Sequence, residues 1–283
     1  MHDNAAGIFR GEGEAGMDEQ WRGTLYPARL PTFHRLPALP ELADRIRWVW
    51  IPEWNLAPGR VSRQELLPFP ALNFVVQPDG VTLSGPATRR AHRDLRGSGW
   101  AVGALLRPAA VPAFTANPGA LLDTEIPFPA PDLHAAVIAA MSAEPNAKDD
   151  GGRHRAQAAA AVVRWFRDHL PPPAPEAALA NRLEELIQAD TALTRVDQAA
   201  GQLGVSVRTL QRLARRYVGL PPLAMIRRYR LQEAAERLRT EPGLAIADIA
   251  AELGYADHAH LTAAFRDVLG FTPSGYRRSS QPD

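Results

Sequence analysis

The last third of the chain contains one pattern twice, and this repeat limits its fold more than any other feature. The first copy is VDQAAGQLGVSVRTLQRLARRYVGLPP (Val196–Pro222), and the second is IADIAAELGYADHAHLTAAFRDVLGFTP (Ile246–Pro273). Leu203-Gly204 in the first copy matches Leu253-Gly254 in the second. After one extra turn residue the matched pairs are Ser206 with Asp257, Leu210 with Leu261, Arg215 with Arg266, Gly219 with Gly270, and Pro222 with Pro273.

The matched residues suit a pair of short helices joined by a tight turn. Gly204 and Gly254 favour a left-handed backbone at a helix end, which costs other residues more. Ser206 and Asp257 can cap the following helix by accepting its free amide hydrogens. Such a pair is a helix-turn-helix, whose second helix can enter the major groove of DNA. Two copies in step therefore predict a tandem of these units.

Between the copies, Leu223–Arg239 is expected to form one helix of about 17 residues, ~25 Å long at 1.5 Å per residue. Neighbouring major-groove faces on one side of a duplex lie roughly 34 Å apart. A rigid helix of this length, with the breadth of each unit, could hold two reading helices in adjacent grooves. Its apolar residues also suit a core helix, and the two roles are compatible.

The charge distribution suggests a polyanionic partner. The net charge of the whole chain is only +1. From Thr191 to the end there are 13 Arg against 9 Asp and Glu residues, a balance of +4. Within this region Gln198–Gln232 holds seven arginines and no acidic residue, which indicates either the footprint of a polyanion or a solvated helix face.

These residues resemble the AraC/XylS family of bacterial transcription regulators. The resemblance rests above all on IADIAAELGYADHAHLTAAFRDVLGFTPSGYR, because the family combines an IAxxxGF/Y turn with a reading helix that ends in FRxxxGxTPxxYR. It covers about Leu193–Arg278, a third of the chain. The resemblance implies a cytoplasmic transcription regulator whose partner is double-stranded DNA, with activation and repression both open.

The first reading helix should follow the cap Ser206, with an exposed face made of Arg208, Thr209, Gln211, Arg212, Arg215 and Arg216. In the family the base-facing positions fall at Arg208, Gln211 and Arg212. Arg can fork onto guanine, and Gln can pair with adenine. Arg215 and Arg216 lie further along and are expected to hold phosphates, which position the protein without specifying a sequence.

The second reading helix has Ala259, Thr262 and Ala263 at the three equivalent positions, which departs from family members that read bases with both helices. Methyl groups there can touch a thymine methyl. The polar residues expected to reach a phosphate or a base edge are His258, His260 and Arg266. The two histidines point about 200° apart on a helix, so they cannot share a metal ion. We therefore predict an asymmetric reader whose first unit dominates.

The rest of the chain predicts a separate, mainly-β domain, so the fold class is α+β. From residue 21 to 130 short apolar runs alternate with turn signals, a pattern typical of a sandwich or barrel. LPFPALNFVVQPDG in this region is loosely similar to the sensor-like domains that precede the module in some family members. We expect a disordered tail (1–20), this sensor domain (21–130), a helical linker or dimerisation segment (131–175) and the helical double helix-turn-helix domain (176–283).

A small-molecule effector is a candidate partner of the N-terminal half. Strand alternation would place Trp48 and Trp50 on one face, and aromatic-lined pockets bind small molecules, although core packing is the more common role of such rings. No effector-binding residue is assigned. The apolar residues of Gly152–Leu170 could pack on the sheet or against a second copy of the chain. RNA polymerase is a further candidate partner, and no cofactor or metal is expected.

Several classes of protein are disfavoured. The chain has no cysteine, which excludes disulfides, thiolate zinc sites and cysteine nucleophiles. The main hydrolase, nucleotide-binding and zinc-protease motifs are absent, no apolar run approaches about 18 residues, and the N-terminus lacks a secretory signal. We expect no enzyme. The alternatives left open are an architectural DNA binder of low specificity and an enzyme domain hidden in the N-terminal half.

Overall fold

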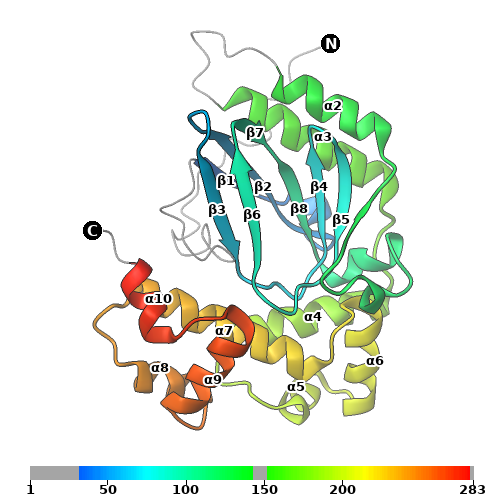
Figure 1. Cartoon of the computed structure of the whole chain (residues 1–283). Coiled ribbons are helices and arrows are strands. Elements are labelled where there is room, and N and C mark those ends of the chain that lie inside the picture. Colours follow the sequence, from blue (N-terminus) through cyan, green and yellow to red (C-terminus); the bar gives the residue numbers. More distant parts are fainter. Residues whose placement is uncertain (1–31, 143–151, 281–283) are drawn as a thin grey trace.

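The computed structural model describes residues 32–142 and 152–280, and the tail predicted over residues 1–20 lies outside them. A β-rich N-terminal domain packs on a helical C-terminal domain, which confirms the predicted fold class (Figure 1). The strands are β1 (Thr32–Pro37), β2 (Ile46–Asn55), β3 (Val61–Leu66), β4 (Asn73–Gln77), β5 (Gly80–Ser84), β6 (Ala91–Arg96), β7 (Ser98–Trp100), β8 (Val102–Leu106) and β9 (Glu125–Pro127). The short 3-10 helices are η2 (Pro40–Leu42), η3 (Pro108–Ala113) and η4 (Pro118–Leu121). The α-helices are α2 (Pro131–Met141), α3 (Arg153–His169), α4 (Pro175–Ala189), α5 (Val196–Leu203), α6 (Val207–Tyr217), α7 (Pro222–Thr240), α8 (Ile246–Glu252), α9 (His258–Leu269) and α10 (Pro273–Ser280).

The main sheet has the strand order β1-β2-β8-β4-β5-β9, with β7 paired to β2. Its pairings are antiparallel, and β3 pairs with β6 in a separate two-stranded sheet. Side chains alternate along β2, because successive residues of a strand point to opposite faces. Val49 and Ile51 face the main core of the domain, whereas Trp48 and Trp50 lie together on the other face.

Helices α2 and α3 cover one face of the main sheet. Val162, Val163 and Phe166 of α3 are buried in the same core as Phe74 and Val102 of the sheet. The apolar side of α3 therefore packs on the sheet of its own chain. This is one of the two arrangements considered from the sequence, the other being packing against a second copy. Within the described residues, no helix is both long and apolar enough to cross a membrane.

The helical domain has two cores that share α7. Met225 and Ile226, near the start of α7, belong to the core around α5 and α6. Ala234 and Leu238, two turns or more further on, belong to the core around α8 and α9. Tyr276 of α10 is 1% exposed and closes the second core. One helix thus joins two small units, each with its own apolar centre.

Candidate nucleic-acid interface

The first helix-turn-helix unit consists of α5, a short turn and α6. Gly204 ends α5 with a φ of 67°, in the left-handed region that favours glycine. The hydroxyl oxygen of Ser206 accepts a 3.1 Å hydrogen bond from the Thr209 amide, so Ser206 caps α6 in the predicted way. The turn and the cap together aim the start of α6 away from α5.

The second unit repeats this geometry with α8 and α9. Gly254 has a φ of 73°, and the Asp257 carboxylate accepts a 2.7 Å hydrogen bond from the His260 amide. Leu261 and Phe265 are fully buried under the turn, as Leu210 and Ala214 are in the first unit. The repeat seen in the sequence is therefore a repeat of structure.

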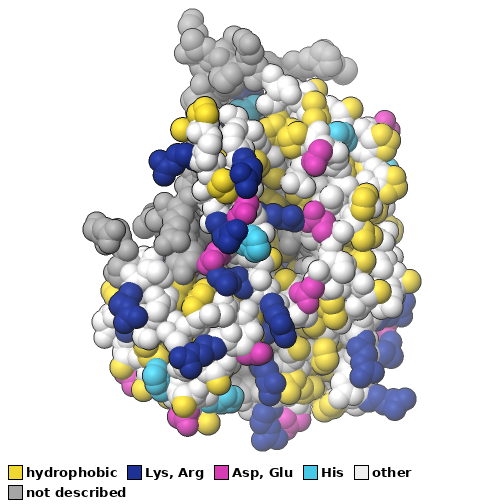
Figure 2. All heavy atoms as spheres, in the orientation of Figure 1, with side chains coloured by type: hydrophobic (Ala, Val, Ile, Leu, Met, Phe, Trp, Pro, Cys, Tyr) yellow, Lys and Arg dark blue, Asp and Glu magenta, His cyan; other side chains and the backbone are white. Residues whose placement is uncertain are grey.

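One side of α6 is buried, and the other side is open to solvent. The buried side packs into the core of the unit and consists of Leu210, Leu213, Ala214 and Tyr217. The predicted contact residues Arg208, Gln211, Arg212, Arg215 and Arg216 are exposed, and Thr209 is half-buried beside the cap. Figure 2 shows basic side chains gathered at the lower right, over α6. These side chains form a polar, cationic helix face of the kind that a major groove accepts.

An acidic residue of α4 contacts two of these arginines. Glu176 accepts hydrogen bonds from Nη1 of Arg212 and, at 2.9 Å, from Nη1 of Arg216. The Tyr217 hydroxyl donates to the same carboxylate at 3.2 Å. The hydrogen bond from Arg212 is the main cause that lowers the pKa of Glu176, so this group is ionised at neutral pH. The contact spans 36 and 40 residues, and no local pattern in the sequence indicates it.

The polar residues of α9 have unequal surroundings. His258, His260 and Arg266 are exposed, and Thr262 is half-buried with its hydroxyl 3.5 Å from Nε2 of His258. His260 is turned toward its own turn, where Nδ1 accepts a 3.2 Å hydrogen bond from an amide and the ring packs edge-on against Tyr255. His258 and Arg266 are therefore better placed than His260 to meet a duplex.

The number of arginines in the acid-free segment Gln198–Gln232 is larger than the number that lie on the surface. Arg230 of α7 is 3% exposed and donates to main-chain carbonyls at the end of α4 and in the loop that follows. Arg228 is half-buried, and burial lowers the pKa of its guanidinium. Five of the seven arginines are exposed, so two of the charges counted in the sequence serve packing more than a partner.

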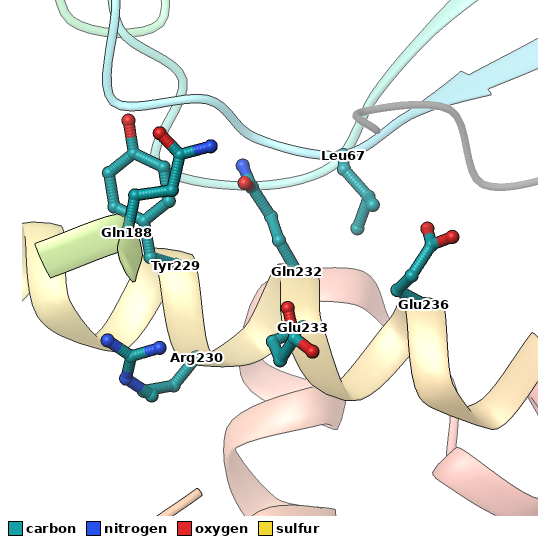
Figure 3. Close-up of a pocket in the computed structure, with 7 residues that line it drawn as sticks. All are labelled: Leu67, Gln188, Tyr229, Arg230, Gln232, Glu233 and Glu236. Carbon is teal, nitrogen blue, oxygen red and sulfur yellow. The ribbon is translucent and has the colours of Figure 1, made fainter. Parts of the chain in front are cut away.

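Helix α7 also lies against the N-terminal domain. Figure 3 shows Tyr229, Gln232 and Glu236 pointing from α7 toward the N-terminal loops, with Arg230 on the other side of the helix. Gln232 donates a 2.8 Å hydrogen bond to the Pro68 carbonyl. The cavity among these residues measures ≈ 10 Å³, which is about the space of one water molecule. It has no room for a larger ligand.

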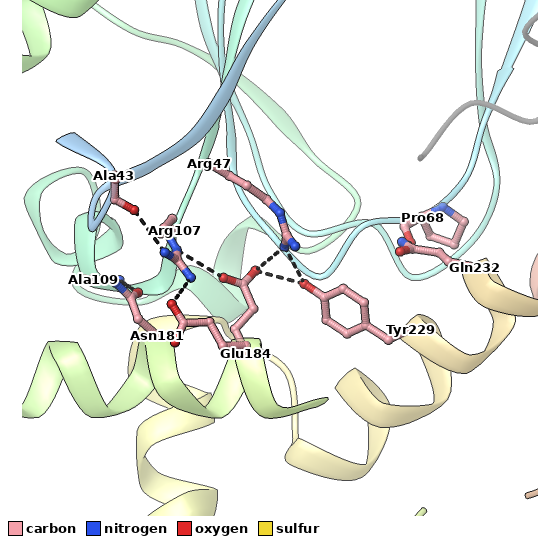
Figure 4. A network of polar contacts seen from close by, with 10 residues as sticks. Ala43, Arg47, Pro68, Arg107, Ala109, Asn181, Glu184, Tyr229 and Gln232 are labelled. Carbon is pink, nitrogen blue, oxygen red and sulfur yellow. Dashed lines mark hydrogen bonds and ion pairs between the residues drawn. The ribbon is translucent and has the colours of Figure 1, made fainter. Parts of the chain in front are cut away.

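A buried polar network joins the N-terminal domain to α4 and α7 (Figure 4). Glu184 of α4 is 1% exposed. Its Oε1 accepts hydrogen bonds from the Tyr229 hydroxyl at 2.8 Å and from Arg47 of β2 at 3.3 Å. Its Oε2 lies 3.7 Å from Nε of Arg107. Asn181, one turn earlier, bonds two main-chain groups of the N-terminal domain.

The N-terminal domain reaches the C-terminal end of each reading helix. Gly219 follows α6 with a φ of 85°, and a Cβ there would lie 2.6 Å from the Gly119 nitrogen in η4. The Arg90 amide donates a 2.9 Å hydrogen bond to the Val268 carbonyl of α9. The Arg90 guanidinium lies 5.2 Å from the centre of the Phe271 ring. The relative placement of α6 and α9 thus depends on the N-terminal domain as well as on α7.

A larger cavity, of ≈ 290 Å³, lies in the N-terminal domain near the end of α3. This volume is near the lower end of the range of small-molecule sites. The residues around it include Phe114, Phe128, Asp132, Trp165 and His169. Trp48 and Trp50 instead pack with Phe69 on the opposite face of the sheet. No group of three or more candidate metal ligands occurs in the part of the chain that the structure describes.

Two capped helix-turn-helix units on one connecting helix define a DNA-binding domain of the double helix-turn-helix class. A helix-turn-helix domain family matches residues 199–279. Putative AraC-like transcription regulators of Streptomyces antibioticus and Streptomyces lividans are 36% identical over 87 residues and 37% identical over 83 residues. The transcriptional activator RhaS of Escherichia coli is 33% identical over 82 residues. Over this domain the chain is similar to AraC-like transcription regulators.

The similarity to relatives is confined to part of their length. The alignment with the Streptomyces antibioticus protein covers 31% of this chain and 28% of that protein. The alignment with the Streptomyces lividans protein covers 29% and 27%, and the alignment with RhaS covers 29% and 29%. In the N-terminal half, a domain of unknown function (DUF6597) matches residues 34–127.

Two solved structures give the extent of structural similarity. The C-terminal domain of AraT, a response regulator from Geobacillus stearothermophilus, has a TM-score of 0.36 and 25% identity, and the match covers 39% of this chain and 92% of that one. ToxT from Vibrio cholerae has a TM-score of 0.41 and 12% identity, over 89% of this chain and 97% of that one.

Proposed function

We propose that this protein is a sequence-specific transcription regulator that reads adjacent major grooves with its two helix-turn-helix units, the first unit dominating. The observation that carries this proposal is the exposed row Arg208, Gln211 and Arg212 on a capped helix, in step with a second capped unit. Each bidentate contact of Arg or Gln with a base supplies about 1–3 kcal/mol of discrimination. Arg215 and Arg216 would hold phosphates.

The second unit would mainly anchor the protein to the DNA backbone. Its exposed alanines can contact a thymine methyl but cannot form a bidentate pair with a base. Arg266 and His258 are exposed on α9 and would contribute phosphate contacts, which carry no sequence information directly.

Control by the N-terminal domain is supported by the contacts it makes with the reading units. In the network around Glu184, Arg47 contacts Tyr229 of α7, the helix that follows α6. Gly219 comes directly after α6, and the Arg90 amide bonds Val268 of α9. A change in the N-terminal domain would therefore alter how α6 and α9 are presented. A small-molecule effector would act in this way, and the cavity of ≈ 290 Å³ near α3 is where we would look for it first.

Double-stranded DNA is the proposed partner, and the bacterial cytoplasm is the proposed location. RNA polymerase and a second copy of the chain are further proposed partners. Sedimentation at high protein concentration tests the second of these, and a persistent monomer would contradict it.

Selection of bound duplexes from a random DNA library by the full-length protein tests the proposal. An Arg208→Ala, Gln211→Ala, Arg212→Ala triple variant is selected in parallel. We expect the unsubstituted protein to enrich one sharply defined half-site with a fainter one about a helical turn away, and the triple variant to lose the sharp half. Binding of every duplex with no enriched sequence would contradict sequence-specific reading and indicate an architectural DNA binder.

A further inference from the structure

We propose that Glu176 is a positioning residue for base recognition, which orients the guanidinium of Arg212 and thereby sharpens the base preference of the first unit. This role rests on the proposed DNA-reading function of α6 and adds a residue of α4 to the same site. Glu176 would touch no base itself. Glu176 would affect base preference through the orientation of Arg212, and it would hold Arg216 beside Arg212.

The carboxylate of Glu176 lies across one helical turn of α6. Arg212 and Arg216 are four residues apart, so their side chains project on the same side of the helix. Oε1 accepts from Arg212, and Oε2 accepts from Arg216 at 2.9 Å. Each oxygen therefore serves one arginine, and the negative charge offsets the repulsion between the two guanidinium groups.

Glu176 is itself more enclosed than the arginines that it contacts. The hydroxyl of Tyr217, a residue only 3% exposed, donates to Oε2 at 3.2 Å from the side of the core. The position in the first turn of α4 also favours a carboxylate, because it faces the positive end of the helix dipole. The Glu176 side chain is 30% exposed, against 57% for Arg212 and 56% for Arg216. The acid is therefore the more enclosed partner of this group, and the arginines are the more exposed ones.

The contact leaves the reading edge of Arg212 open. A guanidinium has five N–H donors, and the hydrogen bonds of Glu176 with the two arginines use only Nη1 of each. The edge formed by Nε and Nη2 can still fork onto O6 and N7 of a guanine. A partner at Nη1 also restricts a long side chain that would otherwise lose its rotamer freedom on binding DNA.

Masking of the arginines from DNA is the opposite role, and the exposure of the group disfavours it. Ion pairs between exposed side chains are weak and are screened by salt. A duplex presents a dense array of phosphates that attracts the same arginines strongly. A half-exposed carboxylate can moderate this attraction, but it cannot keep Arg212 and Arg216 from the DNA.

The test compares Glu176→Gln and Glu176→Ala with the unsubstituted full-length protein. Selection with Arg212→Ala first identifies the base pair that depends on Arg212. Competition binding then measures the preference for the best base at that position over the other three. We expect both Glu176 variants to lose about three- to tenfold of this preference, a part of what a bidentate arginine supplies. The preferences at other positions should stay as they are.

Two controls separate positioning from a general change of charge or fold. Asp197→Asn removes a carboxylate from the same unit, where it pairs with Arg195, and should leave the preference unchanged. Glu176→Gln in an Arg212→Ala background should cause no further loss, because two residues that act as one unit are not additive. Circular dichroism and thermal unfolding of each variant show whether it is folded.

Tighter binding of all duplexes, with an unchanged ratio between the best and altered sites, would mean that Glu176 masks the arginines and would overturn the inference. An equal loss in Asp197→Asn would also overturn it. If the unsubstituted protein enriched no sequence, the proposed function would fail together with the inference. If the unsubstituted protein enriched a site, and Glu176→Gln bound that site with the same base preference, only the inference would fail.

Discussion

The hydroxyl of Tyr229 in α7 donates a 2.8 Å hydrogen bond to Oε1 of Glu184 in α4, and both residues are buried where the two domains meet. Arg47 from β2 donates to the same oxygen at 3.3 Å. Burial raises the pKa of the Tyr229 hydroxyl, so it remains protonated and able to donate. A carboxylate so deeply buried depends on such partners, because an unpaired buried charge is costly. A buried polar network therefore joins the N-terminal domain to α4 and α7, the two helices that frame the first unit.

Glu184→Ala should lower the free energy of unfolding by about 3 kcal/mol or more, because it leaves the largely buried Arg47 guanidinium and the buried Tyr229 hydroxyl without their carboxylate. Urea denaturation of the full-length protein measures this change. Glu185→Ala is the matched control, because Glu185 is the next residue and pairs with Arg107 but is 53% exposed. It should cost less than about 1 kcal/mol. Similar losses in the two variants would contradict the importance assigned to the buried network.

Gly219→Ala should weaken the contact between α6 and η4. An alanine there would require a left-handed backbone and would place Cβ 2.6 Å from main-chain atoms of Pro118 and Gly119. At Gly204 the backbone is also left-handed, but nothing lies within 4 Å of an added Cβ. Gly204→Ala should therefore cost about 1–2 kcal/mol from backbone conformation alone, and Gly219→Ala at least about 1 kcal/mol more. Equal losses in urea denaturation would mean that η4 moves away easily.

Local signals in the sequence predicted the helical domain closely. The turn glycines and the caps Ser206 and Asp257 act within a few residues, so their geometry could be expected without any tertiary information. The connecting helix expected over Leu223–Arg239 is α7, Pro222–Thr240. Arg230 shows where such reasoning stops, because a count of charges cannot distinguish an exposed arginine from one that bonds the end of a neighbouring helix.

The long-range features could not be predicted in the same way. The sequence indicated short strands in the N-terminal half but not their order, and β8 lies between β2 and β4, which precede it in the chain. The contacts of Glu176 with Arg212 and of Arg90 with Val268 join residues from different elements. Each depends on how domains and helices pack, and neither leaves a pattern in the neighbouring residues.

Stability of the N-terminal domain should depend on the ionisation of Glu53. This carboxylate of β2 accepts a 2.8 Å hydrogen bond from Arg155 and lies 2.8 Å from Nε2 of His154, both in α3. Burial acts to raise the pKa of Glu53, but the contacts with Arg155 and His154 together outweigh burial and leave it below the usual 4.5. A lowered pKa stabilises the fold above the unfolded-state pKa, and this contribution is lost as the pH falls through the folded-state pKa.

Glu53→Gln should therefore destabilise the protein by about 1 kcal/mol at neutral pH, a modest value because the pair is partly exposed. The difference between the variant and the unsubstituted protein should shrink as the pH is lowered below the usual pKa of 4.5. Thermal unfolding over a series of pH values measures it. A difference that stays constant with pH would show that Glu53 acts through packing and not through charge.

The asymmetry between the two units is tested most directly by competition binding of Arg212→Ala and Arg266→Ala on the site that the unsubstituted protein selects. We predict that Arg212→Ala loses about 1–3 kcal/mol of discrimination at one base pair. Arg266→Ala should weaken binding to all duplexes alike and reduce the salt dependence by about one phosphate contact. A greater loss of sequence preference in Arg266→Ala than in Arg212→Ala would contradict the dominant role of the first unit.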